Sequence, residues 1–332
     1  MASIKDVAKL AGVSLMTVSR AINQPDRVRE KTLNKVQKAI DSLSYVPYES
    51  AQKMRSRAST SFEDKTIIVL ALDVATTPFS VDILYAIEET LRKHGWHAIV
   101  INTSDITPPD EVIDKVLAQR PAGIIYTSMG LRKVNVPERL RAIPIVLANC
   151  VTDSCQCPAY IPNDRLGQYN AMREVLSRGK SKVLYLTLPQ NIIATPERDK
   201  GFELAISERT EHIDVRKGQL TDPVNYNQTI DMIDDAFQNG YQFDVLVCGN
   251  DRMALVAQMY LLSKGIKIPT EVSILGFDNM LDMSDLFYPQ LTTVELPHRK
   301  IGEEAALHIV MQKTHNDVVS LNCPLIIRNT LQ

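Results

Sequence analysis

The sequence lacks a long apolar run of the kind that crosses a membrane or directs secretion. Its first apolar stretch is interrupted by Lys5, Asp6 and Lys9, and the strongest later run, TIIVLAL at 66–72, ends at Asp73. A membrane-spanning helix needs about 20 predominantly apolar residues, and a signal peptide needs an uninterrupted apolar centre. We therefore expect a cytoplasmic protein without a membrane partner.

Cysteine is scarce as well, with five residues in a chain of 332. The pair Cys155-Gln-Cys157 has neither the spacing nor the neighbouring ligands of a zinc site. An odd number of cysteines suits a reducing compartment, where thiols stay free. We therefore expect free thiols and no metal centre.

Catalytic and nucleotide-binding motifs are also missing. The sequence contains no GxGxxG, Walker loop, HExxH or nucleophile elbow. We expect no catalytic residue and no cofactor, and the chain is predicted not to be an enzyme.

The N-terminus has the pattern of two short helices joined by a tight turn. Ser3, followed by Asp6, is expected to cap the first helix. Gly12 can adopt the left-handed conformation that ends it, and Ser14 is a good N-cap for the second. The apolar residues that we expect in a shared core are Val7, Leu10, Ala11, Val18, Ala21 and Ile22. This is the spacing of a helix-turn-helix, although an ordinary helical hairpin is commoner on patterning alone.

The distribution of charge favours the helix-turn-helix. Residues 1–61 carry eleven Lys and Arg against five Asp and Glu, a net charge of +6, which leaves −8 for the rest because the whole chain carries −2. A basic segment attached to an acidic body is typical of a protein whose small domain meets nucleic-acid phosphates. A third helix is expected over residues 30–43, with its buried face formed by Leu33, Val36, Ala39, Ile40 and Leu43.

Short apolar runs alternate with helical patterns through the rest of the chain. The runs cover residues 66–72, 97–102, 123–128, 144–149, 182–188, 244–250 and 272–278, and helices are expected from about residues 80, 109, 166 and 196 and after residue 250. This alternation predicts an α/β fold with parallel sheets and helices on both faces. Ligands of such folds bind where strands end, here in the loops 73–80, 126–130, 149–151, 188–198, 250–252 and 278–279.

The side chains in these loops suit a polyhydroxylated ligand. Vicinal hydroxyls of a sugar both donate and accept hydrogen bonds, so planar bidentate groups fit them, while an aromatic ring such as Phe79 covers the apolar face of the sugar. The planar groups at these positions are Asn149, Arg198, Asn250 and Asp278. Each has a structural alternative: Asp278, like Asp251, can cap a helix, Phe79 can belong to the core, and Asn163-Asp164 can be only a turn.

The segment IKDVAKLAGVSLMTVSRAIN, followed by SYVPYESAQKM, resembles the lactose/galactose repressor family of bacterial transcription factors. The resemblance continues through TTPFSVDIL, GIIYTSMGL, VLANCV, FDVLVCGNDR, GFDN, LTTVELPH and CPLIIR. It implies a DNA-binding head at 1–46, a hinge helix and linker at 47–65, and a sugar-binding and dimerisation body at 66–332. The hinge helix, over residues 49–54, is too short to be stable alone and would order over the DNA minor groove when two copies meet.

The resemblance also assigns residues to each partner. The DNA contacts that it implies are Leu15, Met16, Thr17, Ser19, Arg20, Asn23, Arg29, Thr32, Tyr45, Ala51 and Met54. Met54 takes the position of an apolar wedge between base steps, and Arg29 replaces the usual serine cap, so it is free to reach a phosphate. The effector pocket that it implies is formed by Thr77, Phe79, Ser80, Ile83, Thr127, Asn149, Arg198, Asn250 and Asp278. Leu296 and His298 would lie near its mouth, although such a histidine is more often a surface residue.

The body is expected to have two subdomains with the sugar between them. The first would comprise about 66–162 and 292–322, and the second about 163–291 and 323–332, so that the chain crosses near Pro162, residue 291 and Cys323. The predicted function is a repressor of a sugar-utilisation operon, bound as a homodimer to palindromic operator DNA and released by the sugar or a sugar derivative. The alternatives are a sugar-binding protein for transport, an enzyme of sugar metabolism, and a regulator that responds to another saccharide or uses a corepressor.

Overall fold

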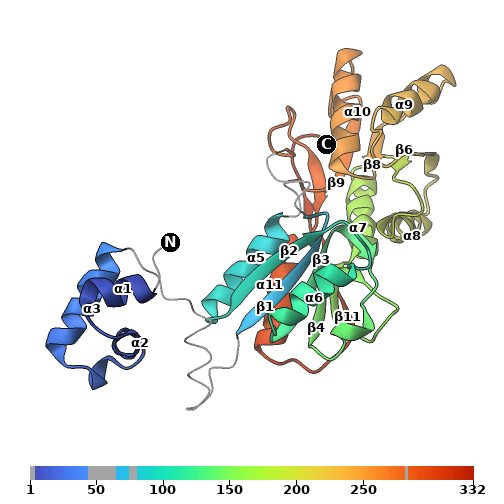
Figure 1. The fold of residues 1–332 in the computed structure, drawn as a ribbon. Coiled ribbons are helices and arrows are strands. Elements are labelled where there is room, and N and C mark those ends of the chain that lie inside the picture. The colour runs from blue at the N-terminus through green and yellow to red at the C-terminus, as the bar shows by residue number, and fades with distance from the viewer. Residues whose placement is uncertain (1–3, 44–64, 75–80, 281–282) are drawn as a thin grey trace. The chain divides into compact units, whose positions relative to one another are not determined.

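The computed structural model describes residues 4–43, 65–74, 81–280 and 283–332, apart from the side chains of residues 23 and 41. The chain divides into two compact units, residues 1–63 and 64–332. Figure 1 shows a small all-helical head and a larger α/β body. Among the described residues, no helix is both long enough and apolar enough to span a bilayer.

The head is built from α1 (Ile4–Ala11), α2 (Leu15–Asn23), the 3-10 turn η1 (Pro25–Arg27) and α3 (Glu30–Ser42). Gly12 has φ +64° between α1 and α2, and the Ser14 hydroxyl accepts a hydrogen bond from the Thr17 N–H at 3.1 Å. The expected turn and N-cap are therefore confirmed. Seven buried side chains form the core: Val7, Ala8, Ala11, Val18, Ala21, Val36 and Ala39.

The prediction that Leu10 belongs to this core is wrong. Leu10 is 56% exposed, whereas Ala8 is buried. The core face of α1 passes through Ile4, Val7, Ala8 and Ala11, which lie three or four residues apart, and Leu10 falls outside this stripe. The expected cap Ser3 lies outside the described residues.

The first lobe of the body contains a six-stranded sheet in the order β11-β5-β4-β3-β1-β2, with every neighbouring pair parallel. Its strands are β1 (Thr66–Leu72), β2 (His97–Thr103), β3 (Gly123–Lys133), β4 (Ile145–Val151), β5 (Ala159–Pro162) and β11 (Val318–Leu321). Helices α5 (Val81–Lys93) and α11 (His298–Val310) pack on one face. Helix α6 (Asp110–Ala118) and the 3-10 turn η5 (Glu138–Leu140) pack on the other.

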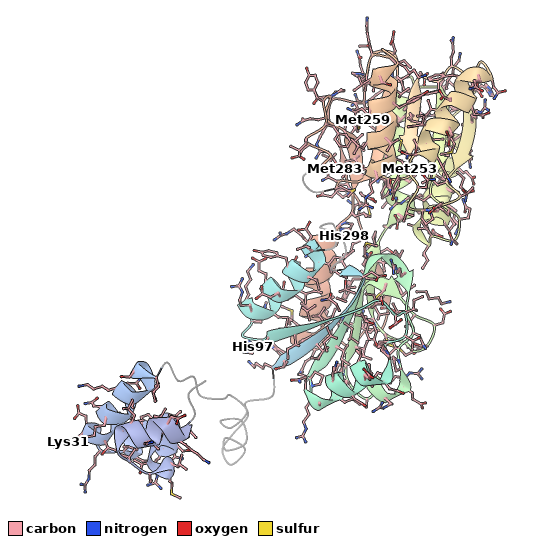
Figure 2. All side chains as sticks on the ribbon, turned by 45° about the horizontal axis from the view of Figure 1, so that its top comes forward. Lys31, His97, Met253, Met259, Met283 and His298 are labelled. Atoms are coloured by element: carbon pink, nitrogen blue, oxygen red, sulfur yellow. A yellow bond between two sulfur atoms is a disulfide. The ribbon has the colours of Figure 1, made fainter. Side chains whose placement is uncertain are left out.

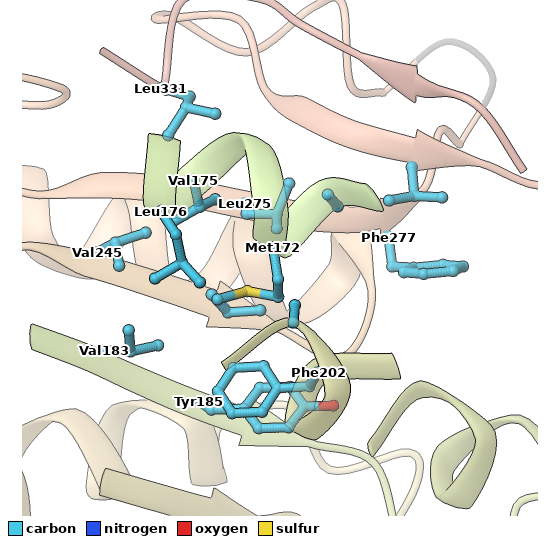
Figure 3. Close-up of a cluster of buried hydrophobic side chains, with 14 of the residues drawn as sticks. Met172, Val175, Leu176, Val183, Tyr185, Phe202, Val245, Leu275, Phe277 and Leu331 are labelled. Carbon is cyan, nitrogen blue, oxygen red and sulfur yellow. The ribbon is translucent and has the colours of Figure 1, made fainter. Parts of the chain in front are cut away.

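The second lobe contains a sheet in the order β12-β10-β9-β8-β6-β7, in which only β10 and β12 are antiparallel. Its strands are β6 (Lys182–Thr187), β7 (Asp214–Gln219), β8 (Val245–Cys248), β9 (Ser273–Asp278), β10 (Thr292–Glu295) and β12 (Leu325–Ile326). Helices α7 (Asp164–Ser177) and α8 (Ala194–Ser207) cover one face, where the Tyr185 and Phe202 rings stack with centroids 4.1 Å apart (Figure 3). Helices α9 (Gln228–Gln238) and α10 (Asp251–Ser263) cover the other.

The chain passes between the two sheets three times, after β5, after β10 and between β11 and β12. The expected crossing near residue 291 is displaced, because β10 still belongs to the second sheet and pairs with β9. Strands β3 and β4 are also longer than expected, so the predicted loops 126–130 and 149–151 lie inside strands. Their pairing shifts register between Thr127 and Arg132, which lets β3 continue past the expected loop.

The expectation that all cysteines are free is wrong. Cys155 and Cys157 form a disulfide across a Cα–Cα distance of 5.7 Å, and the remaining three cysteines are free and buried. The two residues lie in the connection between β4 and β5, which has neither helix nor strand. Irregular backbone of this kind is not predictable from a C-x-C spacing alone.

Candidate functional site

Helix α2 of the head exposes a mixed apolar and basic face. Met16 is 70% exposed, Leu15 and Arg20 are also exposed, and Thr17 and Ser19 are half-buried. Large apolar side chains on the outside of so small a domain mark a surface that meets a partner. These predicted DNA-contacting residues are therefore placed together on one helix.

The remaining predicted DNA contacts are less fully described. Arg29 is exposed, and its carbonyl accepts hydrogen bonds from the N–H groups of Thr32 at 2.8 Å and Leu33 at 3.0 Å, at the start of α3. The Thr32 side chain is half-buried. The side chain of Asn23 and the residues Tyr45, Ala51 and Met54 lie outside the description.

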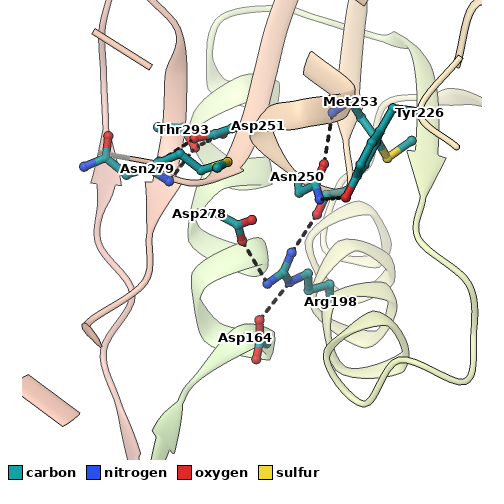
Figure 4. A network of polar contacts seen from close by, with 11 residues as sticks. Asp164, Arg198, Tyr226, Asn250, Asp251, Met253, Asp278, Asn279 and Thr293 are labelled. Carbon is teal, nitrogen blue, oxygen red and sulfur yellow. Dashed lines mark hydrogen bonds and ion pairs between the residues drawn. The ribbon is translucent and has the colours of Figure 1, made fainter. Parts of the chain in front are cut away.

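In the body, Arg198 is the centre of a buried polar cluster (Figure 4). Arg198 lies in the second turn of α8 and is only 6% exposed. Nε donates to Asp164 Oδ1 at 2.7 Å, Nη1 to the Gly249 carbonyl at 2.6 Å, and Nη2 to Asp278 Oδ1 at 3.4 Å. The face of the guanidinium lies 3.5 Å from the centroid of the Phe277 ring. Side chains from α7, α8 and the end of β9 thus meet at one point.

The two carboxylates of this cluster hold their protons more tightly than usual. Burial raises the pKa of Asp278 to about 8. The charge of Arg198 lowers this pKa, whereas the charges of Asp251 and Asp164 raise it further. Burial also raises the pKa of Asp164, although Arg198 lies beside it. A buried site with more carboxylates than cations favours donors such as sugar hydroxyls, which would stabilise the charged form of Asp278.

Asn250 lies at the end of β8, next to this cluster. Its Oδ1 caps α10 by accepting from the Met253 N–H at 3.0 Å, while its Nδ2 donates to the Tyr226 hydroxyl at 3.2 Å. The residue is buried. Asn250 therefore has both a structural role and a polar partner that faces the site.

The predicted residues of the first lobe have free hydrogen-bonding capacity. Asn149 has φ +59°, and its Nδ2 donates to the Ser128 carbonyl at 3.1 Å. The Asn149 Oδ1 and Thr127 Oγ1 atoms are buried and have no partner within the described structure. Ile83, by contrast, belongs to the apolar core between α5 and α11. Thr77, Phe79 and Ser80 lie outside the described residues.

Three polar residues of the site were not assigned to it by the sequence analysis, although Asp251 was weighed there as a possible helix cap. Asp164 was considered part of a turn, but it begins α7 and is buried against Arg198. Tyr226 gave no signal, because it precedes α9 in a polar stretch. Asp251 is fully buried and accepts from the Met280 N–H at 2.9 Å and from the hydroxyls of Ser284 and Thr293 at 2.6 Å each. It therefore fixes the segment that follows Asp278. The motif Gly-Asn-Asp after a buried strand was the signal available for Asp251.

A cavity of about 690 Å³ lies where β9 ends and α11 begins. Asp278, Asn279, Leu296 and His298 are among its lining residues, so the predicted position of Leu296 and His298 beside Asp278 agrees with the structure. The expectation that His298 is a surface residue is wrong: it is buried, and burial lowers its pKa to about 4. His298 is therefore neutral at physiological pH. Figure 2 labels its position in the body.

The two units match two descriptions of known protein families. Residues 3–48 match "Bacterial regulatory proteins, lacI family", and residues 63–329 match "Periplasmic binding proteins and sugar binding domain of LacI family". The chain therefore belongs to the LacI family, with a regulatory DNA-binding head and a body of the sugar-binding type. The expected fold class and the resemblance to the lactose/galactose repressors are confirmed.

Individual relatives cover nearly the whole chain. It is 45% identical to the proteins named sucrose operon repressor in Shigella flexneri and Escherichia coli, over 99% of this chain and of each relative. It is 31% identical to the transcriptional repressor PurR of Vibrio atlanticus, over 100% of this chain and 99% of the relative.

Solved structures share the fold at lower sequence identity. The lac repressor dimer bound to operator and the anti-inducer ONPF has a TM-score of 0.73 at 23% identity, over 99% of this chain and 98% of that one. The complex of the transcriptional regulator CelR with cellobiose has a TM-score of 0.65 at 21% identity, over 99% and 100%.

Proposed function

We propose that this protein represses a sucrose-utilisation operon and leaves its operator when sucrose, or a derivative of sucrose, binds in the body. The observation that carries the proposal is the 45% identity to sucrose operon repressors, which extends over 99% of both chains and so includes the head and the sugar-binding body. The proposed activity is binding without catalysis, and it takes place in the cytoplasm, where an operator is found.

The proposed DNA contacts come from the exposed face of α2. Arg20 can pair in bidentate fashion with a guanine, whereas Leu15 and Met16 offer apolar contacts that favour thymine methyl groups. Tyr45 at the end of the head, and Ala51 and Met54 in the hinge, are proposed as DNA contacts on the strength of the family resemblance alone.

We propose a homodimer as the active form. A single head with few base contacts binds weakly, and a two-fold protein matches a palindromic operator. The body exposes large apolar side chains that a second copy can cover: Tyr288 is 93% exposed, and Val81, Tyr85, Ile99, Val100, Met259 and Leu286 are among the other exposed ones. The lac repressor, which has the same fold, has been solved as a dimer on its operator.

The proposed effector site spans the two lobes. Arg198, Asn250 and Asp278 would bind hydroxyls from the second lobe, while Asn149 and Thr127 would supply their unpaired oxygen atoms from the first. A sugar held by both lobes favours the closed arrangement, and closure about the three crossings is a two-state element that a ligand can bias.

The test is a pair of titrations, with sucrose added to the free protein and to its operator complex. If sucrose weakens operator binding by some factor, the operator must weaken sucrose binding by the same factor. Asp278→Ala should retain operator affinity but lose the response, because a lost hydrogen bond to a charged group costs about 1.5–3 kcal/mol. The exposed Asp231→Asn change on α9 is the control for the loss of one negative charge. Sucrose that leaves operator affinity unchanged, or tightens it as a corepressor would, contradicts the proposal.

A further inference from the structure

The disulfide of Cys155 and Cys157 lies near the surface of the first lobe, in a segment that the proposed effector site does not use. The connection 152–158 joins β4 to β5 and has neither helix nor strand. Both cysteines are half-buried, and Gln156 between them is exposed. Both also pack against the edge of the apolar core that α6 covers. The pair is therefore partly accessible to a dissolved thiol.

The other three cysteines are unreactive in the folded protein. Cys150, Cys248 and Cys323 are each at most 1% exposed. Burial raises the thiol pKa of Cys150 and of Cys323 to about 12, and it also raises the pKa of Cys248. The thiolate is the reactive form of a cysteine. Among the five cysteines of the chain, thiol–disulfide chemistry is therefore confined to Cys155 and Cys157.

A purely structural role accounts poorly for this disulfide. A disulfide stabilises a fold mainly by closing a loop in the unfolded chain, and the effect grows with the length of that loop. The two cysteines are only two residues apart in the sequence, so the loop that they close is very short. The gain in stability from this loop is therefore small.

Hydrogen bonds hold the connection on both sides of the disulfide. Ser154, which precedes the first cysteine, accepts at its Oγ from the Val136 N–H at 2.8 Å. Pro158, which follows the second cysteine, accepts at its carbonyl from the Leu147 N–H at 2.9 Å. These bonds do not depend on the sulfur atoms. The two thiols should therefore stay close together after reduction and be able to form the bond again.

We propose that Cys155 and Cys157 form a reversible dithiol–disulfide site that responds to the thiol redox state of its surroundings. The expected response rests on the proposed function, because it takes the cytoplasmic location from there. A disulfide in that compartment is usually transient and redox-sensing, since glutathione and dithiol reductants keep most thiols reduced. The site gives the protein an input that is separate from any ligand of the body.

The reaction balances with thiols and disulfides as the only reactants. In the reduction, a thiolate of a dithiol reductant attacks one sulfur atom, the bond between Cys155 and Cys157 breaks, and a mixed disulfide forms. The second thiolate of the reductant then releases the protein. The two cysteines have gained two electrons and two protons, and the reductant has become a disulfide. In the oxidation, one cysteine thiolate attacks oxidised glutathione and releases one glutathione, and the other cysteine displaces the second.

The experiment equilibrates the full-length protein in glutathione buffers without DNA or sugar. The ratio of reduced to oxidised glutathione runs from that of the cytosol to a ratio about a thousandfold more oxidising. Thiols are then blocked with N-ethylmaleimide without denaturant, and the blocked peptides are identified by mass spectrometry. Cys155 and Cys157 should both be blocked in the cytosol-like buffer, and at least about half of the pair should be disulfide at the oxidising end. Cys150, Cys248 and Cys323 should be blocked only after unfolding.

Two variants test the pairing. In Cys155→Ser, the remaining Cys157 should carry a glutathione in the oxidising buffers, because it has no internal partner. The matched control is Cys248→Ala, which removes a buried thiol in the second lobe and should leave the redox behaviour of the pair as in the wild type.

Three results would overturn the inference. A pair that stays oxidised in the cytosol-like buffer is a permanent structural disulfide, and a pair that stays reduced in the most oxidising buffer forms no disulfide. Glutathione attached to the wild-type pair in place of the internal bond is the third. Because the assay contains neither DNA nor sugar, each of these results leaves the proposed repressor function standing. Conversely, an operator complex that ignores sucrose leaves the redox site standing.

Discussion

The stability of the body should fall as the pH rises from 6.5 to 8, and Asp278 should be the main cause. Burial raises its pKa from 3.8 to about 8, so the folded protein holds a proton there that the unfolded chain has already lost. Stability falls with pH wherever the folded state binds more protons than the unfolded state. The contribution of Asp278 is therefore fully present below pH 3.8 and is lost as the pH rises through about 8.

The pH window isolates this group from the buried histidines. The pKa values of His298 and His308 are lowered by burial from 6.5 to about 4, so their contribution to stability is lost as the pH falls from 6.5 toward 4. In the unfolded chain each of these histidines is still half protonated at pH 6.5, so their opposite slope fades over about the next pH unit and is small above about pH 7.5. One proton over this window corresponds to about 1.4 kcal/mol per pH unit, hence at most about 2 kcal/mol.

The assay is thermal unfolding of the full-length protein at four pH values between 6.5 and 8 and at constant ionic strength. The transition of the body should move down by at most roughly 4–8 °C in the wild type, since about 1 kcal/mol shifts a domain of this size by 2–4 °C. Asp278→Asn should flatten the slope, and the exposed Asp231→Asn change should retain it. An equal slope in wild type and Asp278→Asn would show that Asp278 is ionised in the folded protein, and the electrostatic account of the cluster would be wrong.

Four other predictions concern single contacts. Arg20→Ala should cost about 1–3 kcal/mol on the operator and little on random DNA, and equal losses in a binding assay on both would make Arg20 a phosphate contact. Ser14→Ala should lower the free energy of unfolding of the head by about 1 kcal/mol, as measured by helical circular dichroism, and no change would mean that the cap bond is not formed in solution. Asp164→Ala should lower the free energy of unfolding of the body by about 3–5 kcal/mol, as measured by urea unfolding, because it leaves the buried Arg198 without one of its partners. Asp164→Asn should cost less, and equal losses in the two variants would contradict this account. Sugar binding at pH 7 should release protons from Asp278, since hydroxyls that donate to a carboxylate favour its ionised form, and calorimetry that gives the same enthalpy in buffers of different ionisation enthalpy would exclude this.

The local patterns of the sequence were sufficient for much of the fold. Gly12 and Ser14 act through their own backbone conformation and nearest neighbours, and both were predicted. The longer buried strands such as β1 and β9 were also predicted, because their apolar runs differ clearly from the helical patterns beside them. The strand β11, with four residues, is too short to produce such a signal. The burial of Leu10 was wrongly predicted because the face of α1 that packs against α2 and α3 depends on how the three helices meet, which the local sequence does not determine.

Polar residues of the candidate site could be predicted where they directly follow a strand, but not where their position depends on contacts between segments far apart in the sequence. Asn250 follows β8 by two residues and Asp278 ends β9, so their position at the edge of the sheet follows from the strand pattern. The contact between Asp164 and Arg198 joins two helices 34 residues apart in sequence, and no local pattern encodes it. The disulfide of Cys155 and Cys157 depends on the irregular backbone between β4 and β5 in the same way.

The buried cluster lowers the stability of the protein on its own, and under the proposed function this cost would favour the binding of a ligand. A carboxylate whose pKa is raised by burial, together with the unpaired Asn149 Oδ1 and Thr127 Oγ1, lowers the stability of the body without a ligand. Replacing such groups with apolar residues would often stabilise a protein of this kind. A polyhydroxylated ligand can form hydrogen bonds with these atoms. Its binding free energy then depends on whether it contacts one lobe or both. Because Arg198 and Asp278 belong to the second lobe and Asn149 and Thr127 to the first, the closed arrangement gains most from the ligand. A ligand that binds two arrangements unequally is the requirement for control of the DNA-binding head.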